Sequence, residues 1–138
     1  MTPPRRHTTA PTIAEIEAIA ADAFASIPDS LRRHVRNVSI HVEDFPDAET
    51  ERDMELESPF DLLGLYLGVS LDRKGIGDQP HDLDRIFLYR RPLLDYWCEG
   101  EEDLTHLVRH VLIHEIGHHF GLSDEAMEAI EQEADETD

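Results

Sequence analysis

The stretch from His114 to Asp124 contains residues whose types and spacing suit a hydrolytic metal centre. Residues four apart on a helix project from nearly the same face, so His114 and His118 can offer two imidazole nitrogens to one metal ion. Glu115, next to the first histidine, can act as a base. A structural zinc usually takes four protein ligands, whereas a catalytic zinc takes three and keeps a position for water. Two histidines and one further ligand therefore favour catalysis.

The third ligand follows from an extension of the same pattern. Gly121 and Asp124 turn HExxH into HExxHxxGxxD, which a shuffled sequence of this composition would contain roughly 0.0004 times. A left-handed glycine at 121 would end the helix and turn the chain back, which brings Asp124 toward the metal. The sequence thus predicts His114, His118 and Asp124 as the ligands of one Zn²⁺ per chain. Glu115 is predicted to be the general base that takes a proton from the attacking water.

Composition limits the fold and the partners. A chain of 138 residues with 40% hydrophobic content fits one domain with a modest core. Its net charge of −19 opposes binding to nucleic acids and to anionic membranes, because such binding requires clustered lysine and arginine side chains. The single Cys98 cannot form an internal disulfide, and neither a signal-peptide core nor an apolar run of about 18 residues is present. We therefore expect a cytoplasmic protein.

Hydrophobic spacing predicts the elements around the motif. We expect a flexible N-terminal tail at 1–11, a folded domain at 12–131 and an acidic C-terminal tail at 132–138. Thr12 and Glu15 have capping-box spacing at the start of a packing helix that Pro28 ends. Strands are predicted at 38–42, 62–71 and 85–90, the last ended by Pro92, with a mobile acidic loop at 43–61 and a turn at 73–80.

The active-site helix is predicted to begin near the acidic residues 101–103 and to end near Phe120. Apolar residues cover most of its circumference, so it should be a buried, central helix. After Asp124, one short helix with a frayed end is expected.

Three segments carry a resemblance to a known family. The core HEIGHHFG with Asp124 as third ligand resembles the metzincin-type signature H-E-x-x-H-x-x-G-x-x-H. With LLGLYLGVSL at 62–71 and DRIFLYRRPL at 84–93, roughly half of the chain looks like the small bacterial zincin-like metallopeptidase family. Met127 lies too close to Asp124 to be the Met-containing turn of the metzincins.

The resemblance implies an α+β fold, a single compact zincin-like domain. In it, a small sheet of about three to four strands packs on an N-terminal helix and a central active-site helix. It also implies a zinc-dependent peptidase acting on peptide or protein substrates. By analogy, the strand at 62–71 is the edge to which an extended peptide would add. A second oxyanion donor is expected, and four candidates stay open: Tyr66, Tyr89, Tyr96 and His110.

The remaining histidines of this helix have a structural and a functional interpretation. His106 and His110 continue the four-residue series ahead of His114, and we expect them to be solvent-exposed. The alternative is that His110 lines the cleft or donates a hydrogen bond to a ligand. His119 points roughly 100° away from His118, so packing or capping is its expected role.

Two other functions are weighed against a peptidase. A non-catalytic metal-binding zincin scaffold would keep the site with little turnover. A metal-dependent endoribonuclease would share the histidine spacing, but Glu115 and the strongly negative chain oppose it. The acidic segments 43–61 and 124–138 are expected to be solvated surface, or else to attract basic peptides to the cleft. The sequence leaves the oligomeric state open.

Overall fold

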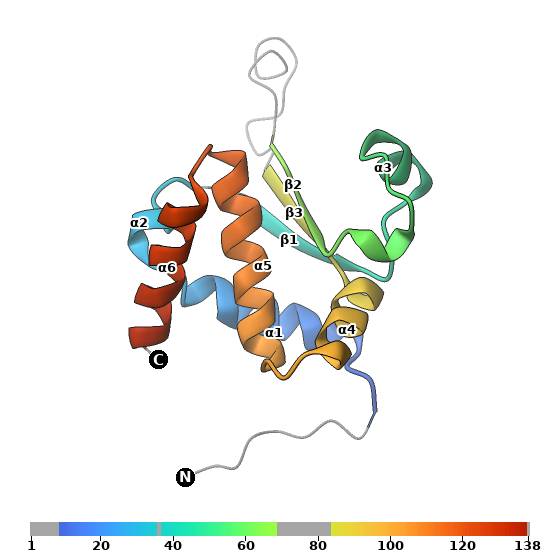
Figure 1. The fold of residues 1–138 in the computed structure, drawn as a ribbon, viewed down its shortest axis with the longest axis horizontal. Coiled ribbons are helices and arrows are strands. Elements are labelled where there is room, and N and C mark those ends of the chain that lie inside the picture. Colours follow the sequence, from blue (N-terminus) through green and yellow to red (C-terminus); the bar gives the residue numbers. More distant parts are fainter. Residues whose placement is uncertain (1–8, 36, 69–83, 138) are drawn as a thin grey trace.

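A three-stranded mixed sheet with the helices Ile13–Ala25 and Leu104–His119 packed against it forms the centre of the fold (Figure 1). The computed structural model describes residues 9–35, 37–68 and 84–137. Along these ranges the elements are α1 (Ile13–Ala25), α2 (Asp29–Arg32), β1 (Val38–Glu43), α3 (Ala48–Asp53), the 3₁₀-helix η1 (Pro59–Asp61), β2 (Gly64–Leu67), β3 (Asp84–Tyr89), α4 (Arg90–Glu99), α5 (Leu104–His119) and α6 (Asp124–Thr137). Helix α3 lies on the other side of the strands from α5 (Figure 1). The α+β class predicted from the sequence is confirmed.

The sheet has the strand order β1-β3-β2, with β1 parallel and β2 antiparallel to β3. Ile86 of β3 is in register with Ile40 of β1 and Tyr66 of β2. Because side chains alternate along a strand, Ile86 and Leu88 project from the same face, and both are fully buried. This face is the one that the helices cover.

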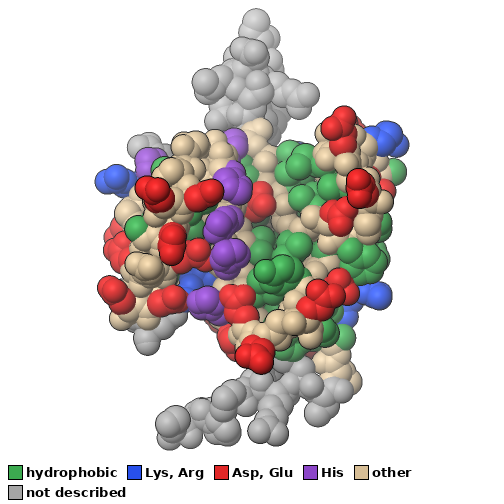
Figure 2. Space-filling view, viewed as in Figure 1, with side chains coloured by type: hydrophobic (Ala, Val, Ile, Leu, Met, Phe, Trp, Pro, Cys, Tyr) green, Lys and Arg blue, Asp and Glu red, His purple; other side chains and the backbone are tan. Residues whose placement is uncertain are grey.

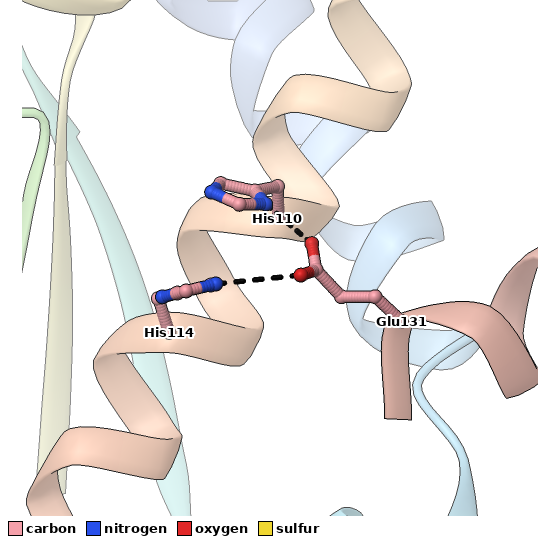
Figure 3. A group of neighbouring side chains, drawn as sticks. All are labelled: His110, His114 and Glu131. Atoms are coloured by element: carbon pink, nitrogen blue, oxygen red, sulfur yellow. Dashed lines mark hydrogen bonds and ion pairs between the residues drawn. The ribbon is translucent and has the colours of Figure 1, made fainter. Parts of the chain in front are cut away.

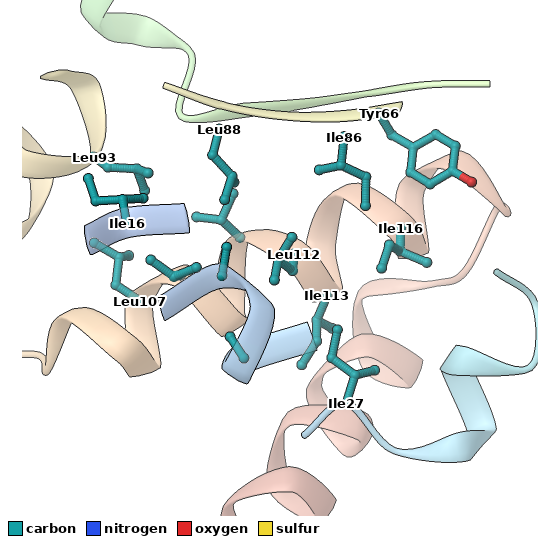
Figure 4. Packing of buried hydrophobic residues seen from close by; sticks show 14 of the residues in the cluster. Ile16, Ile27, Tyr66, Ile86, Leu88, Leu93, Leu107, Leu112, Ile113 and Ile116 are labelled. Atoms are coloured by element: carbon teal, nitrogen blue, oxygen red, sulfur yellow. The ribbon is translucent and has the colours of Figure 1, made fainter. Parts of the chain in front are cut away.

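Helices α1 and α5 pack on each other and on the sheet, and the core lies between them (Figure 4). Figure 4 shows Ile86 and Leu88 pointing from the sheet toward Leu112 and Ile113 of α5. The fully buried residues with the largest side chains are Ile16, Ile27, Leu31, Ile86, Leu88, Leu93, Leu107, Leu112, Ile113, Ile116, Met127 and Val108. Five of these twelve, Leu107, Val108, Leu112, Ile113 and Ile116, belong to α5, which is therefore the central helix that the sequence predicts.

The capping box of α1 is present as predicted. The Glu15 amide donates to the Thr12 hydroxyl at 3.1 Å, and the Thr12 amide donates to the Glu15 carboxylate at 3.2 Å. The helix ends at Ala25, and Pro28 then precedes the single turn of α2.

The ends of α5 also match the expectations. Asp103 caps its start by accepting a hydrogen bond from the His106 amide, and Gly121 after its end is left-handed with φ of 75°. The Leu122 amide donates to the Gly117 carbonyl at 2.9 Å, and the Gly121 amide donates to the His118 carbonyl at 3.2 Å. These two bonds form a Schellman motif, which turns the chain into α6.

The prediction of a loop throughout 43–61 was wrong. This acidic segment contains α3 and η1, and both helices begin at side-chain caps. The Asp47 carboxylate accepts from the Thr50 amide at 2.7 Å, and Ser58 and Asp61 form a capping box. These helices are short and have no buried residues of their own, so they lack the apolar periodicity from which longer helices are predicted.

Helix α4 was missed because Pro92 was taken only as the end of a strand. Pro92 is the third residue of α4, where the amide has no partner within the helix and proline costs little. Pro92, Leu93 and Leu94 are buried, so this first turn anchors α4 to the core.

Some expectations fall partly or wholly outside the described residues. Of the strand predicted at 62–71, β2 covers Gly64–Leu67, whereas positions 69–71 and the turn predicted at 73–80 are not described. Helix α6 is longer than the short helix predicted and includes the buried Ala134. The domain limits at 11 and 131 stay predictions. No helix within the described residues has the length and apolar character that crossing a membrane requires.

Candidate metal centre

Helix α5 carries the HExxH residues, and His114 among them faces α6, where its Nε2 lies 3.3 Å from Oε2 of Glu131. His114 is half-buried and His118 is exposed, and their ring centroids lie 5.7 Å apart at an interplanar angle of 84°. Figure 2 shows a row of histidines along the middle of one face, with acidic side chains on one flank and hydrophobic ones on the other. The row arises because α5 repeats histidine every four residues from 106 to 118.

Glu115 of α5 is half-buried. Burial raises the pKa of its carboxyl to about 7, because the charged form loses solvation. Tyr89 of β3 is close enough for the Glu115 charge to contribute to its pKa, which burial, and then the carboxylates of Glu43 and Asp47, raise to about 12. Glu115 is thus a carboxyl group that can exchange a proton near neutral pH.

Asp124 lies at the first position of α6, just after the turn, and is exposed. Ser123 caps this helix, since its hydroxyl accepts a hydrogen bond from the Ala126 amide at 3.1 Å. Met127, one turn further, is fully buried, and a Cβ atom at Gly117 would lie 2.7 Å from its Cγ. The glycine inside HEIGH therefore lets α6 approach α5 closely.

The described side chains bring one set of three metal-ligating groups together, and it differs from the predicted set. Ligand atoms of His110, His114 and Glu131 all lie within 4.8 Å of one another (Figure 3). His114 belongs to this group, whereas His118 and Asp124 do not. The assignment of Asp124 as third ligand stays a prediction.

Sequence reasoning missed Glu131, although the turn at Gly121 offered a signal. Helices α5 and α6 run antiparallel on either side of this turn (Figure 1). His110 lies eleven residues before Gly121 and Glu131 lies ten after it, so equal rise along two adjacent helices brings them level. Counting outward from Gly121 in the same way places His106 level with Asp135. Nε2 of His106 is 3.1 Å from Oδ1 of Asp135.

The far end of this helix pair is an ion-pair network. Arg109 is buried and donates to Asp135 at 2.5 Å, and His106 lies between Asp135 and Glu102, whose carboxylate is 2.6 Å from its Nδ1. The hydrogen bond to Glu102 and the neighbouring negative charges raise the pKa of His106 above its ordinary value of 6.5. His106 is half-buried rather than solvent-exposed as predicted, and it has a structural role here.

At the other end of α5, His119 packs against the sheet, as expected. Its ring stacks on Tyr66 of β2 with centroids 4.0 Å apart, and a Cβ at Gly68 would lie 2.6 Å from its Cε1. Tyr66 donates to Asp84 at 2.7 Å, and burial together with this bond raises the pKa of the tyrosine. Two of the candidates for a second oxyanion donor therefore differ. The hydroxyl of Tyr66 already donates to Asp84, whereas Tyr89 lies near enough to Glu115 for the two to interact electrostatically.

The donors along α5 and α6 fit a zinc ion by their chemistry. Zn²⁺ prefers imidazole and carboxylate ligands, and a catalytic site combines three protein ligands with one open position. His114 and His118 supply two imidazoles from one face, and Asp124 and Glu131 supply carboxylates from the next helix. The half-buried carboxyl of Glu115, next to the first histidine, is a group that could accept a proton from a water molecule beside the ion.

Comparison with known proteins gives the family. The sequence model of a family described as zincin-like metallopeptidase matches residues 35–134, which include the sheet, α5 and most of α6. No curated protein matches the chain. The match covers well over half of the chain and contains every residue of the predicted site.

Proposed function

Because the chain belongs to the zincin-like metallopeptidase family, we propose that it is a zinc-dependent peptidase. Its ligands are His114, His118 and Asp124, which hold one Zn²⁺ per chain, and Glu115 is the general base. The observation that carries this proposal is the position of Glu115, half-buried beside two histidines of the same helix. Its carboxyl pKa of about 7 supports the role, because general bases work best when their pKa is near the operating pH.

The chain's own residues then have separate tasks. Bound zinc supplies Lewis acidity, which polarises the peptide carbonyl and acidifies water. A carboxylate oxygen of Glu115 orients the attacking water, takes its proton, and delivers that proton to the nitrogen of the leaving amine. Burial keeps other water away from this carboxylate, so the proton passes between the reacting groups.

The substrate we propose is an extended peptide beside β2. This strand is at one edge of the sheet and packs against α5, so a peptide that adds to it would pass close to Glu115 and His118. The net charge of −19 favours peptides with basic residues, as the field of an acidic protein attracts cations. A cytoplasmic location, suggested by the single cysteine, is part of the proposal.

The test compares the protein with its Glu115→Gln variant. We expect the variant to keep its zinc, measured by elemental analysis, and to lose about 10²–10⁴-fold in the rate of cleavage of a peptide library. Glu128→Gln, which changes an exposed glutamate of α6, is the matched control and should cleave like the original protein. A chelator should stop cleavage in both.

The outcomes separate the three functions. Equal cleavage by the original protein and Glu115→Gln would reject the proposed base. Tight zinc binding without any proteolysis would instead establish the non-catalytic scaffold. Metal-dependent cleavage of structured RNA, with no cleavage of peptides, would establish the endoribonuclease.

A further inference from the structure

Glu131 projects from α6 toward two successive histidines of α5 (Figure 3). One carboxylate oxygen, Oε2, is 3.3 Å from Nε2 of His114, and the other, Oε1, is in hydrogen-bond contact with Nδ1 of His110. The two imidazole rings lie beside each other, with centroids 4.2 Å apart. This pair is closer than the pair His114 and His118, whose ring centroids are 5.7 Å apart.

The carboxylate of Glu131 has different partners from the carboxylate of Asp135, one turn further along α6. Asp135 is paired with the permanent positive charge of Arg109. Within the described residues, the ion-pair partners of Glu131 are His110 and His114, which carry no permanent charge. The Glu131 side chain is 20% exposed, and the partial loss of solvation favours a cation beside its carboxylate.

The three groups have the chemistry and spacing of ligands for a divalent ion. Two imidazoles and one carboxylate are a donor set that Zn²⁺ and similar metals bind. Ligands about 2.1 Å from a tetrahedral ion are roughly 3.4 Å from one another, close to the 3.3 Å between His114 and Glu131. The side chains of His110 and His114 are 42% and 29% exposed, so an ion can reach them from solvent.

We propose that His110, His114 and Glu131 form a second position for a divalent metal ion, one helical turn from the predicted catalytic one. The two positions share His114. A ring nitrogen has one lone pair, and Nε2 of His114 can coordinate one ion at a time, so the positions are alternatives rather than a dinuclear centre. The existence of the catalytic position rests on the proposed function, but that of the second position does not.

The test measures zinc binding by calorimetry in variants that remove one position each. His118→Ala destroys the catalytic pair and should still bind one Zn²⁺ through the second position. Adding Glu131→Gln to His118→Ala should weaken binding at least about 100-fold, because even indirect partners of a metal ligand contribute 10–100-fold to affinity. His114→Ala should lose both positions, whereas His106→Ala, the matched control on the same face, should bind like the original protein.

A spectroscopic measurement identifies the ligands and checks the fold. Circular dichroism of His118→Ala should be unchanged, since His118 is exposed. In that variant, Zn²⁺ should shift the imidazole NMR signals of His110 and His114 and leave those of His106 in place. With Co²⁺, the same variant should give visible absorption bands that disappear when Glu131→Gln is added.

The results distinguish this inference from the proposed function. If His118→Ala fails to bind zinc although it is folded, the second position does not exist, and the peptidase proposal is untouched. If His118→Ala binds zinc and His110→Ala does not, the second position is established and is the site of the chain, which overturns the catalytic ligand set. If each single variant binds one ion and the double variant His110→Ala/His118→Ala binds none, both positions exist.

Discussion

The two ends of the α5–α6 pair use the same kinds of side chains for different purposes. At the end away from Gly121, Arg109 and His106 of α5 both pair with Asp135 of α6. The permanently charged side chain of Arg109 thus links the two helices. Toward the turn at Gly121, histidines and the carboxylates of Glu131 and Asp124 are present, and the described residues provide no arginine partner for Glu131. Among the described residues, an arginine joins the histidine–carboxylate contact at the Asp135 end and none joins it at Glu131, which agrees with a structural role for the first end and with the metal positions proposed for the second.

The largest effect that separates the two ends is expected from Asp124→Ala. In a Glu131→Gln background, which removes the second position, this change should lower zinc affinity at least about 100-fold. Proteolysis should fall in parallel, because the variant holds no metal at working concentrations. Calorimetry and a peptide-cleavage assay provide the measurements. Unchanged affinity would show that Asp124 is not a ligand.

The complementary change at the structural end is Asp135→Ala. It removes a carboxylate partner of the buried Arg109, and we expect the free energy of unfolding to fall by about 1–2 kcal/mol. Zinc affinity should stay the same. Urea denaturation of the metal-free protein measures the first quantity, and calorimetry measures the second. A loss of zinc affinity in this variant would mean that both ends belong to one site.

A smaller effect should follow from Gly117→Ala. Alanine favours a helix by about 1 kcal/mol over glycine, but its Cβ would clash with the buried Met127, which costs about 1–3 kcal/mol. We expect a net loss of about 1 kcal/mol in the free energy of unfolding. In a Met127→Ala background the same substitution should be stabilising. A loss that persists without Met127 would refute the proposed contact.

The smallest effect concerns the pH dependence of stability. Carboxylate partners raise the pKa of His106 in the folded protein above its ordinary value of 6.5. The stabilisation is therefore complete below about pH 6.5 and is lost as the pH rises through the folded-state value. For a half-exposed pair it amounts to a few tenths of a kcal/mol. Urea denaturation of His106→Gln between about pH 5 and pH 8, a range of about 1.5 units on either side of the ordinary histidine pKa, should give a flatter dependence of stability on pH than the original protein.

Elements with strong local signals could be predicted from the sequence. The capping box of Thr12 and Glu15 fixes the start of α1, and Gly121 has the left-handed conformation that its place after the helix requires. The apolar residues of α5 are so dense that its burial follows from composition alone. Each of these features depends on residues within a few positions of one another.

Elements whose causes are distant or subtle were not predicted. Helix α3 depends on a single cap at Asp47 in an acidic segment, and α4 follows β3 directly and has Pro92 in its first turn. The contact of Glu131 with His110 depends on how α6 crosses α5, which follows from the Schellman turn and from Met127 packing on Gly117. Spacing within one helix carries no information about such a crossing.

Every residue proposed as a metal ligand lies on α5 or α6, between positions 110 and 131, and none comes from the sheet. Under the proposed function, mutations along β2 would therefore change which peptides bind without changing the coordination of the ion. Conversely, one substitution in α5 or α6 would alter the proposed chemistry and leave the edge of the sheet at β2 intact. Under this proposal, the choice of peptide and the reactivity of the metal centre can evolve independently.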